Sequence, residues 1–108
     1  METESVKYFR NNDVVLRDIH SMYFLINVRE KYFEGNQALI KINEVGVQIW
    51  TVIAECHEFE LICNKIIRLY SIPFSELQTV KNDIREFCHN LVELGYLKND
   101  RGSNSELA

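Results

Sequence analysis

The sequence is poor in residues that interrupt or crosslink a chain. It contains one proline, four glycines and three cysteines among 108 residues. The cysteines, Cys56, Cys63 and Cys88, are odd in number and form no CxxC pair, so they do not indicate a disulfide framework. The first residues are acidic and do not resemble a signal peptide, and no apolar run approaches the roughly 20 residues that span a bilayer. We therefore expect a cytoplasmic protein with reduced thiols.

Motifs typical of catalysis and of nucleotide binding are also absent. The sequence has no Gly-rich phosphate loop and no HExxH, GxSxG or EF-hand pattern. Two pairs, Cys56-His57 and Cys88-His89, could supply a nucleophile or metal ligands only by meeting across helices, because neighbours on a helix point about 100° apart. Burial of Cys63 and Cys88 beside solvated histidines is the simpler interpretation. We expect no enzyme activity, no cofactor and no metal site.

The residues that are present suit one small globular domain. Hydrophobic residues make up 46% and charged residues 26% of the chain, a balance typical of a packed core. The formal net charge of −4 disfavours nucleic acid or an anionic membrane as the main partner, because both require a basic surface. We expect an N-terminal arm over residues 1–12, the domain over 13–98 and a disordered tail over 99–108.

The first half of the chain is rich in β-forming residues with an alternating pattern. Strands are expected over residues 13–19, 22–33 and 37–42. The segment Glu34-Gly35-Asn36 is a turn signal between the last two strands, because Gly and Asn tolerate a positive φ. These three short consecutive strands predict an antiparallel meander.

The second half has helical periodicity. Asn43 is a candidate N-cap for a first helix, and a second helix is expected over residues 58–70. Ser75 and Gln78 form a capping-box pattern for a third helix, which Gly95 should end before a short extended segment. The expected core includes Ile42, Ile49, Trp50, Ile53, Ile62, Ile66, Leu69, Leu77, Ile84, Phe87 and Leu91.

One short run resembles a family signature. The run from Leu39 to Trp50, LIKINEVGVQIW, resembles the pattern LN-x-[TS]-G-x-x-I-W of proteins similar to the pyrroloquinoline quinone synthesis protein D. Diffuse apolar spacing extends the resemblance from Asp13 to Lys98. Val45 stands where the pattern has a hydroxyl residue, and Cys56-His57-Glu58 stands where the family has Gly-x-[ST] before the second helix.

The resemblance implies both a fold and a function. The fold would be α+β, a three-stranded antiparallel meander followed by three helices, similar to a winged helix-turn-helix. Members of this family recognise ribosomally made, post-translationally modified peptides: the leader adds as a strand to the third strand and packs against the third helix. Stand-alone members serve a separate radical S-adenosylmethionine enzyme or a leader peptidase of a lasso-peptide pathway. The chain would then be a non-catalytic binding protein.

An edge strand suits this role, because its unpaired N–H and C=O groups can bind an extended peptide. Lys81 and Arg85, on the flank of the third helix, could pair with carboxylates of an acidic leader. The expected peptide-binding residues are Gln37, Ala38, Leu39, Ile40, Lys41, Ile42, Lys81, Ile84, Arg85 and Cys88.

Alternatives stay open at this point. Lys81, Arg85 and His89 recur along the third helix, which in a winged-helix transcription regulator would enter the major groove of DNA. Against this, the helix carries four acidic residues and only two Lys or Arg residues. The edge strands also leave open a homodimer formed by domain swapping.

Overall fold

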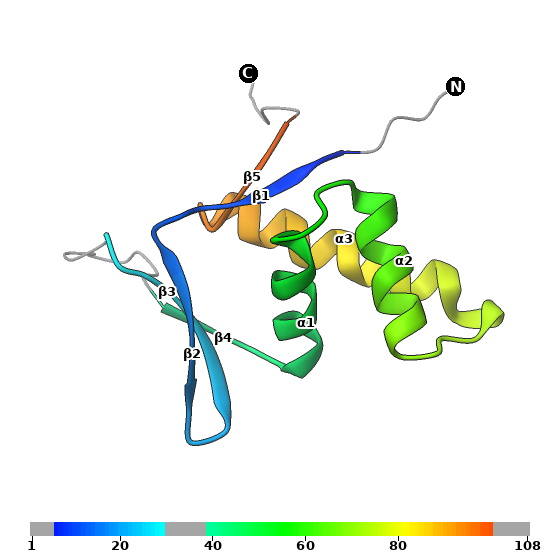
Figure 1. Cartoon of the computed structure of the whole chain (residues 1–108), viewed down its shortest axis with the longest axis horizontal. Helices are drawn as coiled ribbons and strands as arrows, with labels where there is room; N and C mark the ends of the chain where they lie inside the picture. The colour runs from blue at the N-terminus through cyan, green and yellow to red at the C-terminus, as the bar shows by residue number, and fades with distance from the viewer. Residues whose placement is uncertain (1–5, 30–38, 101–108) are drawn as a thin grey trace.

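A computed structural model of the chain describes residues 6–29 and 39–100 (Figure 1). In this part the chain is α+β, with a three-stranded antiparallel sheet followed by three α-helices, which confirms the predicted fold class. The elements are β1 (Tyr8–Arg10), β2 (Val14–Ile19), β3 (Met22–Asn27), β4 (Leu39–Ile42), α1 (Glu44–Ile53), α2 (Phe59–Leu69), the 3₁₀ turn η1 (Phe74–Glu76), α3 (Leu77–Glu93) and β5 (Leu97–Asn99).

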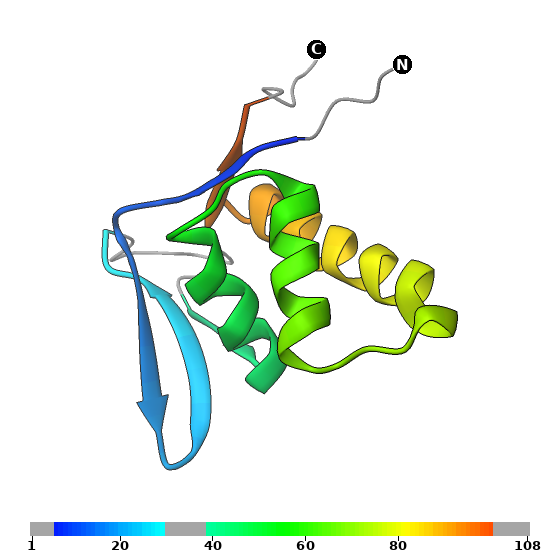
Figure 2. The same ribbon diagram turned by 45° about the vertical axis from the view of Figure 1, so that its right-hand side comes forward.

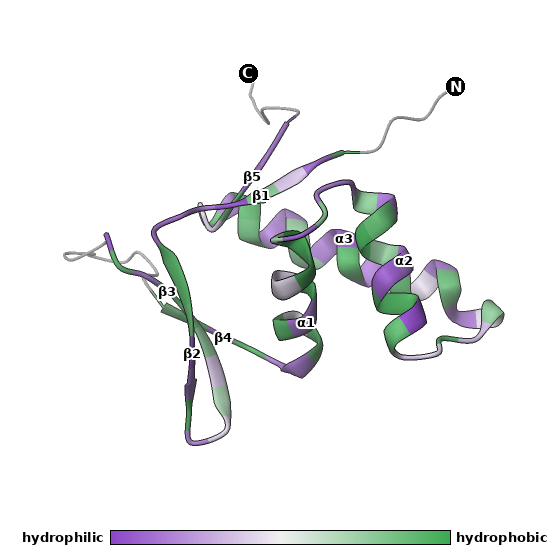
Figure 3. Cartoon of the chain, in the orientation of Figure 1, coloured by the Kyte–Doolittle hydropathy of each residue, from purple (hydrophilic) through white to green (hydrophobic). Residues whose placement is uncertain are grey.

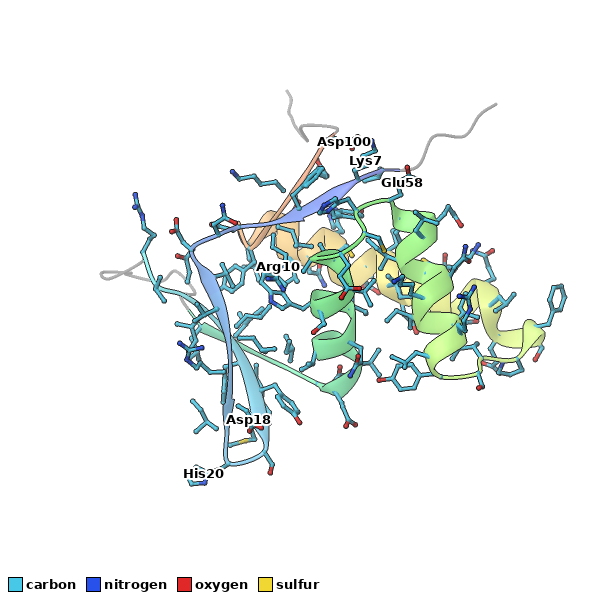
Figure 4. The ribbon with its side chains drawn as sticks, viewed as in Figure 1. Lys7, Arg10, Asp18, His20, Glu58 and Asp100 are labelled. Carbon is cyan, nitrogen blue, oxygen red and sulfur yellow. The ribbon has the colours of Figure 1, made fainter. Side chains whose placement is uncertain are left out.

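The three-stranded sheet has the order β2-β3-β4 and lies to one side of the helices (Figures 1 and 2). His20 and Ser21 join β2 to β3 with φ values of 53° and 66°, as a tight hairpin turn with two positive φ angles requires. The Oδ1 atom of Asp18 accepts a hydrogen bond from the Ser21 N–H at 3.1 Å. Residues 20 and 21, which lie between the two expected strands, therefore form the tip of a hairpin, where Figure 4 labels Asp18 and His20.

Alternation along the strands directs one face of this sheet towards the helices. Leu25 of β3 is fully buried and lies opposite Ile40, while Tyr23 lies opposite the buried Ile42. Leu39 and Lys41 of β4 are exposed, as their alternate positions require. The expected turn at 34–36 and the first two residues of the expected third strand lie outside the described residues.

The junction between β4 and α1 depends on a cap and a close contact. The side chain of Asn43 accepts a hydrogen bond from the Gly46 N–H at 2.8 Å, which confirms the predicted N-cap. A Cβ atom at Gly46 would lie 3.1 Å from Cε1 of Phe87 and 3.2 Å from Cβ of Ile42. The missing side chain therefore lets α3 pack directly onto the start of α1.

The two ends of α3 differ in how well the sequence predicted them. The predicted capping box was wrong. Ser75 lies in η1, and α3 begins at Leu77 with no side-chain cap. The reason is that the chain after Pro73 forms a 3₁₀ turn. At the other end, Gly95 has a φ of 83°. Its N–H donates to the Val92 carbonyl at 3.0 Å, and the Tyr96 N–H donates to the Leu91 carbonyl at 2.8 Å. This is a Schellman motif, and it confirms that Gly95 ends the helix.

A second, two-stranded sheet joins the N-terminal segment to the chain after α3. Tyr8 of β1 lies opposite Asn99 of β5, and Figure 1 shows the two strands side by side. The Lys7 N–H donates to Oδ1 of Asp100 at 3.0 Å, and the Asp100 N–H donates to the Lys7 carbonyl at 3.1 Å. Ordered structure therefore includes part of the expected arm and the first two residues of the expected tail.

The side chains of β1 anchor this sheet to the helices. Tyr8 is buried and meets the Phe59 ring edge-on, with 6.4 Å between the ring centroids. Arg10 points towards α1 (Figure 4), where its guanidinium lies 4.9 Å from the Trp50 ring centroid and donates to the Trp50 carbonyl at 3.3 Å. This strand was not predicted, because the sequence analysis assigned residues 1–12 to an N-terminal arm.

The core lies between the sheet and the three helices, and hydrophobic residues line the helix faces that meet there (Figure 3). Phe87 is half-buried against this core, and Leu77 is also partly exposed. Leu69 was wrongly predicted as a core residue. It is the last residue of α2 and is 56% exposed, because this end of the helix lies at the surface. The predicted core residues that are buried are Ile42, Ile49, Trp50, Ile53, Ile62, Ile66, Ile84 and Leu91.

Two of the three thiols belong to this core. Cys63 of α2 and Cys88 of α3 are both 0% exposed, whereas Cys56 is half-buried. Burial raises the pKa of both core thiols from 9.0 to about 12. At neutral pH these two cysteines are therefore protonated apolar residues and poor nucleophiles.

We predict that Gly46→Ala destabilises the protein by about 1 kcal/mol, although alanine favours a helix by a similar amount. The added methyl group would press on Phe87 and Ile42, and the ring would have to move. Chemical denaturation measures the change. In a Phe87→Leu background the same substitution should cost much less, and a Gly46→Ala variant more stable than the wild type would contradict the close contact.

We predict that iodoacetamide at pH 8 alkylates Cys56 in the folded protein and spares Cys63 and Cys88. Burial excludes the reagent from these two sulfurs and keeps them protonated. Peptide mass spectrometry after timed quenching locates the label, and labelling in denaturant supplies the control for full reactivity. Equal labelling of all three cysteines in the native state would show that the α2–α3 core is open.

The same thiols predict a pH dependence of stability. In the unfolded chain a thiol ionises near pH 9, whereas in the folded chain Cys63 and Cys88 keep their protons up to about pH 12. Unfolding therefore releases protons in this window, and the free energy of unfolding should fall as pH rises from 9 to 12. Urea titrations at several pH values measure this. Replacing both cysteines with alanine should reduce the slope to the part that Tyr8 contributes, since burial raises its pKa from 10.0 to about 12.

Candidate functional site

The outer edge of β4, defined as the side away from β3, is the first part of the candidate site. Among the described residues β4 pairs with β3 alone, so the backbone groups along its other side have no strand partner there. Leu39 is 48% exposed, and Lys41 is also exposed. This edge can therefore accept a further strand.

A cleft beside the end of β4 is the second part. This α1–α3 cleft has a volume of about 600 Å³ and lies between the start of α1, the end of α2 and one flank of α3. Asn43, the residue directly after β4, lies on its wall. The apolar residues that line it are Val45, Ile49, Ile66, Ile72, Val80, Ile84 and Phe87. An apolar side chain next to β4 would find a water-excluding surface here.

Polar residues lie around this apolar surface. Asp83, Glu86 and Asn90 of α3 line the cleft and are exposed, and Tyr70 lines it from the end of α2. In the part of the chain that the structure describes, no Lys, Arg or His lines the cleft. The cleft thus combines an apolar floor with an acidic rim.

The structure separates the predicted α3 residues into two groups. Ile84 lines the α1–α3 cleft. Lys81 instead pairs with Glu60 of α2, with 3.1 Å between Nζ and Oε1. The Arg85 guanidinium lies 4.8 Å from the Phe59 ring centroid, and Cys88 is fully buried. These last three residues lie on the flank that faces α2.

Helix geometry explains this division. Residues 81, 85 and 88 follow one side of the apolar seam through Ile84, whereas 80, 83 and 87 follow the other side. The sequence spacing defines both flanks but does not say which one lies beside β4. The sequence analysis for this reason did not assign the cleft-lining residues Val80, Asp83, Phe87 and Asn90 to the site, although Phe87 was among the expected core residues.

The predicted β4 residues lie where they were expected as far as the structure describes them. Leu39, Ile40, Lys41 and Ile42 form β4, with Ile40 and Ile42 turned towards the core. The remaining two, Gln37 and Ala38, lie outside the described residues.

The two Cys-His pairs do not come together. Nδ1 of His57 lies 3.0 Å from the Tyr8 carbonyl oxygen, and its ring lies 4.4 Å from the Phe9 ring. Nε2 of His89 lies 3.5 Å from a Glu93 carboxylate oxygen at the surface. Within residues 6–29 and 39–100, no group of three or more His, Cys, Asp or Glu side chains could hold a metal ion. Nor does any helix there have the length and apolar character needed to cross a membrane.

A solved structure with a similar fold is described as TbiB1 in complex with the TbiA(beta) leader peptide. It matches this chain with a TM-score of 0.63 and 23% sequence identity, over 83% of this chain and 94% of that chain. At this identity the match shows a shared fold. A comparison with curated proteins gives no match.

The family comparison covers most of the chain. The sequence model described as coenzyme PQQ synthesis protein D (PqqD) matches residues 14–97, from the first residue of β2 to the first residue of β5. This range includes β4, the Asn43 cap, Gly46 and all three helices. The chain therefore belongs to the PqqD family.

Proposed function

We propose that this protein captures the leader of a ribosomally made precursor peptide by strand addition and presents it to a separate maturation enzyme. The observation that carries this proposal is the unpaired outer edge of β4 beside an apolar cleft. Membership of the PqqD family supports it, and so does the fold shared with TbiB1, which is described in complex with a leader peptide.

In this proposal the peptide pairs with Leu39–Ile42 as a fourth strand of the sheet. Backbone hydrogen bonds would set its register, and alternate side chains would enter the α1–α3 cleft over Val80, Ile84 and Phe87. Lys81, Arg85 and Cys88 are left out of the contact surface because they face α2.

The proposed role is binding without catalysis. Cys63 and Cys88 are buried and protonated, and the Cys-His pairs lie apart from the cleft. The chemical change would belong to the partner, a radical S-adenosylmethionine enzyme or a leader peptidase. Its setting would be the cytoplasm, where precursor peptides are synthesised and thiols stay reduced.

The charge distribution disfavours a DNA-binding role for the α2–α3 pair. Asp83 and Glu86 are exposed on α3, whereas Lys81 is engaged with Glu60. A helix in the major groove must neutralise phosphates, and these carboxylates would oppose it.

We predict that a synthetic leader, taken from a precursor peptide encoded beside this gene, shifts the backbone amide resonances of Leu39–Ile42 and of Val80, Asp83 and Phe87. In an extended peptide, every second backbone N–H group points towards β4. Methylating the nitrogens of this set should weaken binding by about 1 kcal/mol for each blocked hydrogen bond. Methylating the other set, whose N–H groups point away from β4, is the matched control. Calorimetry measures the affinities.

Two outcomes would contradict this function. Equal tolerance of methylation in both sets would exclude strand addition. Tight, salt-sensitive binding of duplex DNA, with no response to any leader peptide, would favour a transcription regulator instead.

A further inference from the structure

The acidic rim of the α1–α3 cleft has no counter-charge in the described part of the chain. Three other surface carboxylates there form ion pairs with Lys or Arg: Glu60 with Lys81, Glu55 with Lys65 and Asp13 with Arg29. Asp83 and Glu86 have no such ion pair among residues 6–29 and 39–100. Two negative charges therefore stand at the edge of an apolar surface that a peptide would cover.

We propose that Asp83 and Glu86 determine specificity by selecting a Lys or Arg side chain on the bound peptide, two residues from an apolar side chain that fills the cleft. This inference rests on the proposed function and adds the charge and spacing of the ligand. The expected charge on the bound peptide is therefore positive, whereas the sequence analysis assigned Lys81 and Arg85 to the carboxylates of an acidic leader.

The geometry supports the spacing. Asp83 and Glu86 are three residues apart on α3, so their Cβ atoms lie about 5–6 Å apart on neighbouring turns. Side chains two residues apart in an extended peptide share a face and lie about 7 Å apart. An apolar side chain over Val80 and Phe87 therefore leaves the next residue on that face within reach of the two carboxylates.

Charge decides between basic and acidic ligands. The protein has a net charge of −4, and a carboxylate on the peptide would meet Asp83 and Glu86 with no cation lining the cleft in the described chain. Because both acids are exposed, their attraction for a basic side chain should be moderate and should weaken with salt. The apolar floor supplies affinity, and the rim supplies selection among peptides that could pair with β4.

A display library of random decapeptides tests this without knowledge of the natural leader. Wild-type protein should enrich peptides in which Lys or Arg stands two residues from an apolar residue, in one of the two orders. The variant Asp83→Lys/Glu86→Lys should lose this preference and favour Asp or Glu at the same position. A peptide enriched on the wild type should bind this variant about tenfold more weakly at low salt.

The matched control is Glu55→Lys/Glu93→Lys, which makes the same formal charge change at exposed sites away from the cleft. It should keep the wild-type preference and lose little affinity. If the Lys variant fails to fold, Asp83→Asn/Glu86→Gln removes the charge with little change in shape, and it should abolish the basic preference.

The outcomes separate this inference from the proposed function. Enriched peptides that shift the Leu39–Ile42 amides but show no basic preference would overturn the inference and leave strand addition intact. Equal loss of affinity in the control variant would also overturn it, because the effect would then be long-range. A library with no peptide that shifts those amides would overturn both.

Discussion

The contact between Phe87 and the start of α1 is the interaction on which the candidate site depends. A side chain at position 46 would press on the Phe87 ring at 3.1 Å, so glycine sets how closely α3 approaches the end of β4. That approach brings Asp83 and Glu86 into the lining of the α1–α3 cleft, which Asn43, the residue directly after β4, also lines. A bulkier residue would move the helix that carries the floor and the rim together. This explains physically why the family-like run from Leu39 to Trp50 has glycine at this position.

Local signals in the sequence predicted most of the fold, because they act over a few residues. The alternation in β4, the Asn43 cap and the stop at Gly95 each involve groups within one turn or one strand. The capping box failed at the same range, since the segment after Pro73 formed a 3₁₀ turn. β1 could not be predicted because its partner, β5, lies about ninety residues later and neither strand exceeds three residues.

The candidate site was predicted in part, for a geometrical reason. Strand pairing follows chain order, so the position of β4 at the edge of the meander could be expected from the sequence. The orientation of α3 depends on tertiary packing, above all on Phe87 at Gly46 and on Arg85 over Phe59. Periodicity is symmetric about the apolar seam, so it could not distinguish the basic flank from the acidic one. Rotating α3 to the other flank would reverse the charge of the cleft rim.

The hydrogen bonds between Lys7 and Asp100 bring the two ends of the described chain to one place. Figure 4 shows these residues near one another beside β1 and β5, while the α1–α3 cleft lies at the opposite, N-terminal end of α1. A polypeptide attached at either end would therefore leave the molecule away from the cleft. Such a fold can be joined to another protein through one or both ends and still keep the outer edge of β4 open.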